Sequence, residues 1–246
     1  ELNYGVQIIN QAIAEKDLTN YTIGGSEEYT YTKVTNNVAW LNVSKAGIIS
    51  GTPTVISTVA ANDTIRVSDG VNEPIEFSIS AGKVAPAPAD REVISSAAFT
   101  GWENPAIGDE LNSSYKYTFQ SKISSAAGAP YHLAEATNIQ FQKKSGDEWV
   151  VMSNGEAFAE GQYKFVNQLR CDGDNGSFYV LDNAANLSVT INGVACSVSA
   201  GYTGDTFSYV YISREFTIGV TTSISNSPVD TKAVKSIVIG RLLIIG

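Results

Sequence analysis

The sequence is poor in the residues on which nucleophilic and metal-dependent enzymes rely. Its 246 residues include one histidine and two cysteines. A Ser-His-Asp or Cys-His site would have to use His132, yet the sequence has no Gly-x-Ser-x-Gly elbow. The metalloprotease motif His-Glu-x-x-His and the glycine-rich phosphate loops are also absent. His132 lies in GAPYHLAEA, a stretch typical of a solvated loop.

Basic residues and long apolar runs are scarce as well. Sixteen Lys and Arg stand against 25 Asp and Glu, which gives a net charge of −9. Binding to nucleic acid rests on clustered Lys and Arg, so this partner class is excluded. The apolar stretch at 236–246 is interrupted by Arg241 and falls short of the roughly 20 residues of a membrane span. Because the chain opens at Glu1 with neither an initiator Met nor a basic-then-apolar leader, we expect a mature chain from which any export signal has been removed.

Short bursts of alternating apolar and polar residues are abundant. They include EYTYTKV, TIRVSDG, IEFSIS, YKYTFQS, QYKFVNQLRC and FSYVYIS. This period of two predicts half-buried strands, and no long stretch keeps a helical period. Asn-Gly and Asp-Gly pairs between the bursts favour tight reversals. They are Asp69-Gly70, Asn154-Gly155, Asp172-Gly173, Asn175-Gly176 and Asn192-Gly193. The sequence therefore predicts an all-β protein built of β-sandwiches.

One seam divides the chain. In GKVAPAPADREV, Pro86 and Pro88 alternate with alanine, and proline fixes φ and removes a backbone donor. We predict a first sandwich at 1–83, a stiff Pro/Ala linker at 84–90 and a second sandwich at 91–246. The segment 221–246 reads as a loop followed by a strand or a pair of strands, which extends the second sandwich or offers an edge to a partner.

The stretch GIISGTPT, residues 47–54, carries the most specific motif. A turn at Gly47 precedes a brief strand that Pro53 ends. With Trp40-Leu41 upstream and Val67-Ser68-Asp69-Gly70 downstream, the segment 20–82 resembles the Ig-like, cadherin-like repeats of bacterial surface proteins.

The second half is similar to another Ig-like repeat, found in surface proteins of gut bacteria. The resemblance is carried by Trp149, by FAEGQYKF at 158–165, by Phe178 and by VTING at 189–193. Together the two resemblances imply two tandem Ig-like β-sandwich domains. They also imply a bacterial protein that is secreted or held at the cell surface or outer envelope.

The two cysteines are expected to face one core. Strand alternation places Cys171 with Tyr163, Phe165 and Leu169, and it places Cys196 with Val194 and Val198. Small residues usually occupy both positions in the similar repeats. In an exported protein this pair suggests a disulfide, and two reduced, buried thiols are the alternative.

The acidic stretches do not match a metal site. CDGDNGSF, from Cys171, lacks the ligand order of an EF-type calcium loop and is better explained as a hairpin turn. ADRE at 89–92 resembles a cadherin calcium motif, but the further Asp and Asn clusters with which that motif works are missing. We therefore predict neither a metal nor a cofactor.

Aromatic residues are the remaining candidates for binding. Trp40 and Trp149 match core positions of the two repeats, whereas Trp102 lies in a loop-like stretch beside Pro105. Exposed aromatic rings stack on sugars or anchor protein interfaces, although tyrosine is also common strand filler. We predict contact roles for Trp102, Tyr115, Tyr117 and Tyr202; Tyr209 and Tyr211 are two further tyrosines that could face water.

These features favour a protein without catalysis. The resemblance implies adhesion or surface scaffolding, with a host or cell-surface protein or a glycan as the partner. The alternative is a carbohydrate-binding accessory module of a polysaccharide-degrading system, for which exposed, roughly coplanar aromatic rings would be evidence. A glycoside hydrolase would need paired acids in a cleft.

Overall fold

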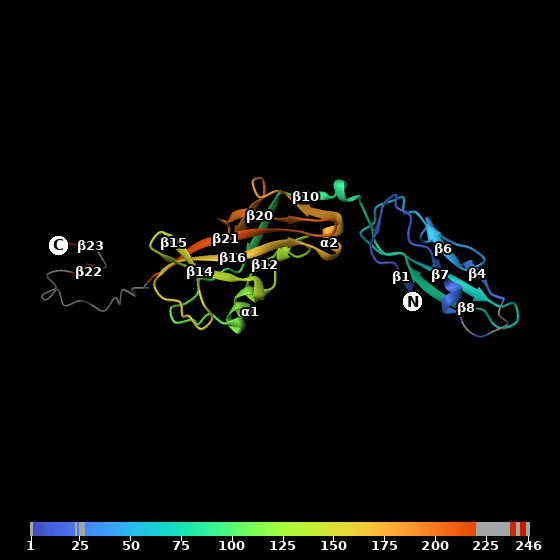
Figure 1. The fold of residues 1–246 in the computed structure, drawn as a ribbon, viewed down its shortest axis with the longest axis horizontal. Helices are drawn as coiled ribbons and strands as arrows, with labels where there is room; N and C mark the ends of the chain where they lie inside the picture. Colours follow the sequence, from blue (N-terminus) through green and yellow to red (C-terminus); the bar gives the residue numbers. More distant parts are fainter. Residues whose placement is uncertain (1, 23, 25–27, 220–236, 240–241, 245–246) are drawn as a thin grey trace, which may run out of the picture.

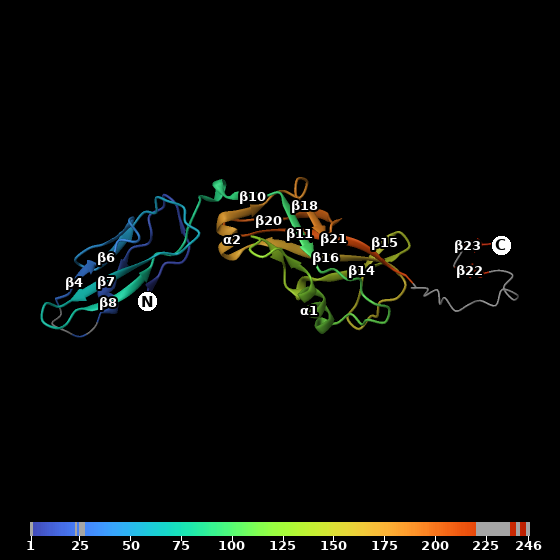
Figure 2. The same cartoon turned by 180° about the vertical axis from the view of Figure 1, so that it is seen from behind.

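The computed structural model describes residues 2–22, 24, 28–219, 237–239 and 242–244. The predicted all-β class is confirmed, because the chain is mostly strands whose sheets lie in a sandwich-like arrangement. Two groups of sheets follow one another along the long axis of the molecule (Figure 1), and the view from behind shows the same succession (Figure 2). We call them the N-terminal sandwich, residues 2–85, and the C-terminal sandwich, residues 92–218.

The N-terminal sandwich packs a four-stranded sheet against a three-stranded one. Tyr31, Ile65 and Ile79 of the first sheet share one core cluster with Leu41 and Ile49 of the second, and all five are at most 1% exposed. The four-stranded order is β1 (Leu2–Asn3), β8 (Ile75–Ser80), β7 (Asn62–Ser68) and β4 (Thr30–Lys33). The three-stranded order is β3 (Lys16–Asp17), β6 (Ile48–Gly51) and β5 (Leu41–Val43), and β2 (Gln7–Ile8) pairs with β9 (Val84–Ala85). The 3-10 helix η1 (Leu18–Tyr21) follows β3.

The short strand predicted in GIISGTPT is β6, and its two glycines have separate tasks. Gly47 has φ +87°, and a Cβ there would lie 2.7 Å from Cε2 of Tyr31, so the turn packs on a core ring. A Cβ on Gly51 would lie 2.2 Å from the carbonyl oxygen of Trp40. Gly51 therefore lets β6 run close beneath Trp40.

A buried ion pair fixes the loop between β4 and β5. Nζ of Lys33 lies 2.8 Å from Oδ2 of Asp63, whose side chain is 0% exposed. The same carboxylate accepts hydrogen bonds from the Thr35 hydroxyl and from the backbone N–H groups of Asn37 and Val38. The loop is thus held by one carboxylate that has a partner for each oxygen.

The C-terminal sandwich has a larger, aromatic core. Phe141, Phe165 and Ile212 of its largest sheet pack with Phe99 and Ile191 of a facing sheet. The largest sheet has the order β15 (Glu148–Val151), β14 (Gln140–Ser145), β16 (Gly161–Cys171), β21 (Ser208–Ile218) and β20 (Ser197–Thr203), with β13 (His132–Leu133) also on β16. The facing sheet has the order β12 (Ser124–Ser125), β11 (Ser96–Thr100), β18 (Ser188–Ile191) and β19 (Val194–Ala195), and β10 (Glu92–Ile94) pairs with β17 (Tyr179–Leu181).

Two segments expected to be extended or turned are helical. YKYTFQS lies in helix α1 (Ser113–Lys122), which Asn112 caps by accepting the N–H of Tyr115 at 2.8 Å. Leu111, Tyr115, Phe119 and Ile123 recur every four residues and pack toward the core, so a helical stripe overrides the local alternation. CDGDNGSF forms the short helix α2 (Gly173–Phe178) after Asp172 instead of a hairpin turn. The 3-10 helix η3 (Ala136–Asn138) lies between β13 and β14.

The predicted linker is partly sheet. Val84 and Ala85 form β9 and are 3% and 0% exposed, so the stretch without a strand partner begins at Pro86. Val84 and Ala85 can pair with β2 because both prolines of the stretch, Pro86 and Pro88, come after them. The 3-10 helix η2 (Pro88–Asp90) completes the connection to β10.

The C-terminal segment contains two short strands. β22 (Ile237–Ile239) pairs with β23 (Leu242–Ile244) in an antiparallel sheet of their own. Residues 221–236, 240–241 and 245–246 of the predicted extension lie outside the described residues.

Candidate functional site

Trp102 is not an exposed contact residue, and this expectation is wrong. Its side chain is 6% exposed and meets Phe119, Phe165 and Phe216 edge to face, with ring centroids 5.1–5.3 Å apart. The guanidinium of Arg214 lies 4.4 Å from the ring centroid on a cation-π contact. The loop after β11 therefore folds over the sheet and delivers the indole to the core.

Tyr115 and Tyr117 are separated by the helix that carries them. In a strand they would share a face, but two residues on a helix lie about 200° apart. Tyr115 is half-buried and stacks on Phe119, and burial together with Asp109 raises the pKa of its hydroxyl well above the usual range. Tyr117 is 57% exposed. The two tyrosines do not form one surface.

Trp149 was expected in the core but lies half-exposed on the edge strand β15. Nζ of Lys164 stands 4.4 Å from its ring centroid, and Nζ of Lys144 stands 5.8 Å away. The exposure of Trp102 and Trp149 is thus the reverse of the one predicted.

Tyr202 belongs to an aromatic strip on the hairpin of β20 and β21. We define this aromatic strip as Tyr202, Phe207, Tyr209 and Tyr211. Tyr202 and Tyr209 are cross-strand partners, and the rings of Tyr202, Phe207 and Tyr209 are inclined by 14–29° to one another. Tyr202, Phe207 and Tyr211 are 51%, 40% and 39% exposed. Tyr211 departs from this arrangement, because its ring stands at 86° to that of Tyr209. Only the rings of Tyr202, Phe207 and Tyr209 are nearly parallel, and those of Tyr202 and Phe207 are exposed.

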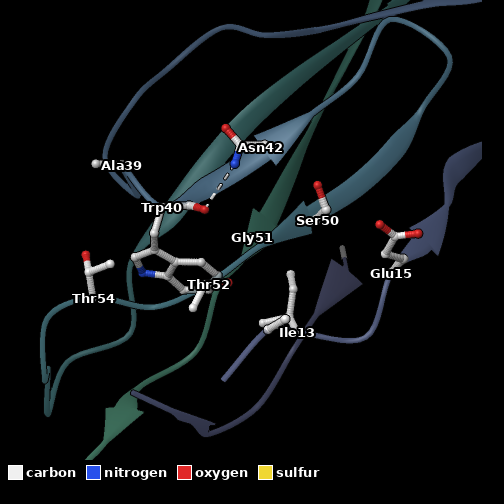
Figure 3. A pocket seen from close by; sticks show the side chains of 10 residues that line it. Ile13, Glu15, Ala39, Trp40, Asn42, Ser50, Gly51, Thr52 and Thr54 are labelled. Carbon is white, nitrogen blue, oxygen red and sulfur yellow. Dashed lines mark hydrogen bonds between the residues drawn. The ribbon is translucent and has the colours of Figure 1, made fainter. Parts of the chain in front are cut away.

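A second candidate surface is an open hollow of about 630 Å³ in the N-terminal sandwich (Figure 3). It lies on the three-stranded sheet, on the side away from the core: Leu41 and Ile49 point inward, whereas their neighbours Asn42 and Ser50 lie opposite each other and line the hollow. We call it the Trp40 hollow. Its lining residues are Ala12, Ile13, Glu15, Ala39, Trp40, Asn42, Ser50, Gly51, Thr52 and Thr54.

Trp40 forms the aromatic side of this hollow. Its side chain is half-buried, and the ideal Cβ position on Gly51 is 3.1 Å from ring atom Cε3. The backbone N–H of Ile13 donates a hydrogen bond of 2.9 Å to the carbonyl of Gly51, which places Ile13 beside the indole. The indole therefore packs directly on the backbone of Gly51, which has no side chain to hold it away. Figure 3 shows Thr52 and Thr54 beside the ring.

Strand alternation contained the signal for Trp40. Leu41 is an inward residue of β5, so its neighbours Trp40 and Asn42 should face outward. Matching Trp40 to a core position of the resembled repeat hid this simpler inference. Phe207, the other missed aromatic residue, begins the alternating burst FSYVYIS, in which Val210 and Ile212 face inward. The same alternation therefore placed Phe207 outward with Tyr209 and Tyr211.

The expected disulfide is not formed, because both cysteines are free thiols. Cys171 is buried as predicted, and Cys196 is half-buried against the same core. Ser197, next to Cys196, lies opposite Ser213, which pairs with Val166. Cys171 is five residues farther along β16, about 17 Å at roughly 3.3 Å per residue, whereas a disulfide needs Cα atoms within about 7 Å. Burial raises the pKa of each thiol to about 11.

The structure places His132, the single histidine of the sequence, near one carboxylate. His132 lies on the short strand β13 and not in a loop; it is exposed, and its Nε2 is 3.5 Å from Oδ1 of Asp172. Among the described residues, no three or more His, Cys, Asp or Glu side chains are grouped so that they could hold a metal ion. Among these residues, no helix is long and apolar enough to cross a membrane.

Comparisons with known proteins give structural likenesses alone. No family model matches the chain, and no curated protein matches it. Among solved structures, human protocadherin-24 EC1-2 is 11% identical, with a TM-score of 0.26, and the match covers 86% of this chain and 92% of that chain. The I-band fragment I67-I69 from titin is 8% identical, with a TM-score of 0.24, and the match covers 85% of each chain. The all-β assignment rests on the sheets described above.

Proposed function

We propose that this chain is a non-catalytic, Ig-like modular protein of a bacterial surface that acts in adhesion or in spacing a surface assembly. In this proposal the N-terminal module ends at Ala85, a short join covers 86–90, and the C-terminal module begins at Arg91. Separate core clusters in the two sandwiches support this division. The ISGTP stretch and the second motif series support an exported bacterial protein, secreted or held at the envelope.

The join between the sandwiches carries the proposal. Arg91 is 8% exposed and donates from Nε to the carbonyl of Pro88 at 3.0 Å, which fixes the join locally. Its Nη1 donates to the carbonyl of Gly176 at 2.8 Å, and its Nη2 donates to that of Gly204 at 2.9 Å. The C-terminal end of the join is therefore fastened to α2 and to the β20–β21 hairpin.

The other end of the join is fastened to the N-terminal sandwich by β9. In addition, Nζ of Lys83 lies 2.6 Å from Oδ2 of Asp174 in α2, an ion pair between the two sandwiches. A freely jointed pair of modules would need none of these contacts. A join held at both ends suits a spacer or an adhesive stalk, which must keep its binding surfaces at a set distance from the cell.

An adhesion assay on the whole chain tests this function. Beads coated with the protein are passed over immobilised matrix proteins and over a glycan array, and retention under flow is measured. We expect retention on at least one surface and no release of reducing sugar from polysaccharides. Retention on neither surface would exclude adhesion, and sugar release would exclude a non-catalytic role.

The aromatic strip favours a second candidate, a carbohydrate-binding accessory module. The exposed rings of Tyr202 and Phe207, inclined by 29° to one another, offer apolar area to a polysaccharide chain. Pull-down on insoluble polysaccharides separates the two candidates. Binding that Tyr202→Ala abolishes and Tyr117→Ala leaves intact would favour the accessory module, because Tyr117 is equally exposed but outside the strip.

A further inference from the structure

We propose that the Trp40 hollow binds an uncharged pyranose ring of a neutral glycan. The inference rests on the proposed adhesive function and deepens it by naming a ligand class for the N-terminal sandwich. It concerns a different surface from the aromatic strip, which lies on the C-terminal sandwich.

The first argument is that the Trp40 indole is held in a fixed position. Trp40 is half-buried over Gly51 and packs against the core cluster of the N-terminal sandwich, so its ring is held in place before any ligand arrives. An aromatic face offers apolar area to the C–H face of a sugar, and a fixed ring loses little conformational freedom on binding. The hollow also has the size of a small-molecule site, since such sites span roughly 300–1,000 Å³.

The second argument is the set of polar residues that line the hollow. Thr52 and Thr54 lie beside the indole, and Ser50, Asn42 and Glu15 line the rest of the hollow (Figure 3). Within the described residues, the Asn42 amide makes only a 3.4 Å hydrogen bond to the Trp40 carbonyl, and the other four side chains have no hydrogen-bond or ion-pair partner. These groups can therefore donate to and accept from a ligand that carries several hydroxyls.

The same polar groups disfavour an apolar occupant. A hydrophobic side chain of a partner protein would cover hydroxyls, an amide and a carboxylate without replacing their hydrogen bonds to water. Each buried group left without a partner costs about 1–3 kcal/mol. A sugar replaces those bonds while it still covers the indole.

The third argument is charge. Glu15 is the one charged residue in the lining, and neither Lys nor Arg contributes to it. The whole chain carries a net charge of −9. Sialylated, uronic-acid and sulfated glycans would place a negative charge beside Glu15, which favours neutral sugars as ligands.

The test uses the full chain and a glycan array that pairs each neutral glycan with its sialylated or sulfated form. The strongest neutral binder is then titrated into ¹⁵N-labelled protein, whose three tryptophans give three indole N–H signals. We expect a shift of the Trp40 signal alone. Trp40→Ala should weaken binding 10- to 100-fold, whereas Trp149→Ala, which removes the other half-exposed tryptophan, should leave it unchanged.

Two further variants keep the test decisive if Trp40→Ala does not fold. Asn42→Ala and Thr54→Ala alter exposed side chains outside the core, and each should weaken binding 3- to 10-fold. Binding that none of these variants reduces, a preference for the charged member of each pair, or silence of the array would overturn the inference. Silence with bead retention on a matrix protein would overturn the inference and leave the proposed function standing. Glycan binding at Trp40 without bead retention would exclude adhesion and leave the ligand assignment standing.

Discussion

The two sandwiches solve the same packing problem with different chemistry. In the N-terminal sandwich the fully buried core is aliphatic except for Tyr31, and a buried Lys33–Asp63 ion pair organises the adjoining loop. In the C-terminal sandwich eight aromatic rings belong to the buried core, and α1 contributes one of them. They are Phe99, Trp102, Phe119, Phe141, Phe158, Tyr163, Phe165 and Phe216. The first sandwich should therefore be sensitive to loss of a charge, and the second to loss of a ring.

The largest effect is expected from Asp63→Ala. The substitution leaves Lys33 without its counter-charge and removes the acceptor of three hydrogen bonds around Asn37. Breaking one partner of a buried pair costs about 3–5 kcal/mol. Hydrogen exchange measured by mass spectrometry should show lost protection over residues 28–85 with protection over 92–218 unchanged.

Glu76→Ala is the matched control for Asp63→Ala. Glu76 also pairs with a base, Arg66, at 2.6 Å in the same sheet, but both side chains are about half exposed. Exposed pairs contribute about 0–1 kcal/mol, so this variant should resemble the parent protein. Equal destabilisation by both substitutions would show that the buried pair has no special role.

A comparable loss is expected from Phe141→Ala in the other sandwich. Phe141 is 0% exposed and meets the rings of Phe119, Phe158 and Phe165. Truncating such a ring costs about 3–5 kcal/mol. Calorimetry should show a lowered transition for the C-terminal sandwich alone, while Tyr117→Ala on the exposed side of α1 should change little. A shared drop of both transitions would mean that the two sandwiches unfold as one unit.

A smaller effect is expected from Arg91→Ala, which acts on the join between the sandwiches. The carbonyls of Gly176 and Gly204 lose their donor, at a cost of about 1–3 kcal/mol. Small-angle X-ray scattering should report a broader distribution of interatomic distances, because the join is released at one end. Lys83→Ala, which removes a partly exposed ion pair, should have less effect. An unchanged distribution for Arg91→Ala would contradict the spacer model.

Local alternation was sufficient to predict most of the sheet structure. The bursts around Ile65, Ile79 and Phe165 became β7, β8 and β16, and in β16 the predicted face of Phe165 points inward. Asn192-Gly193 reverses the chain between β18 and β19. The alternation of side chains along a strand is set by backbone geometry, so it does not depend on the rest of the fold. The helix α1 was missed because YKYTFQS alternates over a few residues, while its helical stripe shows only when Leu111 and Ile123 are included.

The candidate site was harder to predict than the sheets. Whether an aromatic residue is exposed depends on how loops fold over a sheet, and neither the loop of Trp102 nor the edge position of Trp149 follows from local pattern. The prediction of a disulfide between the two cysteines was wrong for a related reason. Alternation fixed the direction of Cys171 correctly, but the distance to Cys196 depends on strand register, which the sequence does not reveal.

The last effect follows from the thiols; it is absent at neutral pH and separates the sandwiches only as the pH rises. Burial raises the pKa of Cys171 and Cys196 from 9.0 to about 11, and both lie in the C-terminal sandwich. Between pH 9 and 11 the unfolded chain releases thiol protons that the folded chain keeps, so stability is full below pH 9 and falls as pH rises. In the N-terminal sandwich, burial and Tyr21 raise the pKa of Tyr4 from 10.0 to about 12. This sandwich should therefore begin to lose stability only above about pH 10. Denaturant titrations from pH 8 to 10.5 should therefore lower the C-terminal transition first, and the double variant Cys171→Ala, Cys196→Ala should flatten that decline. A decline of the same steepness in the double variant would mean that other groups cause it.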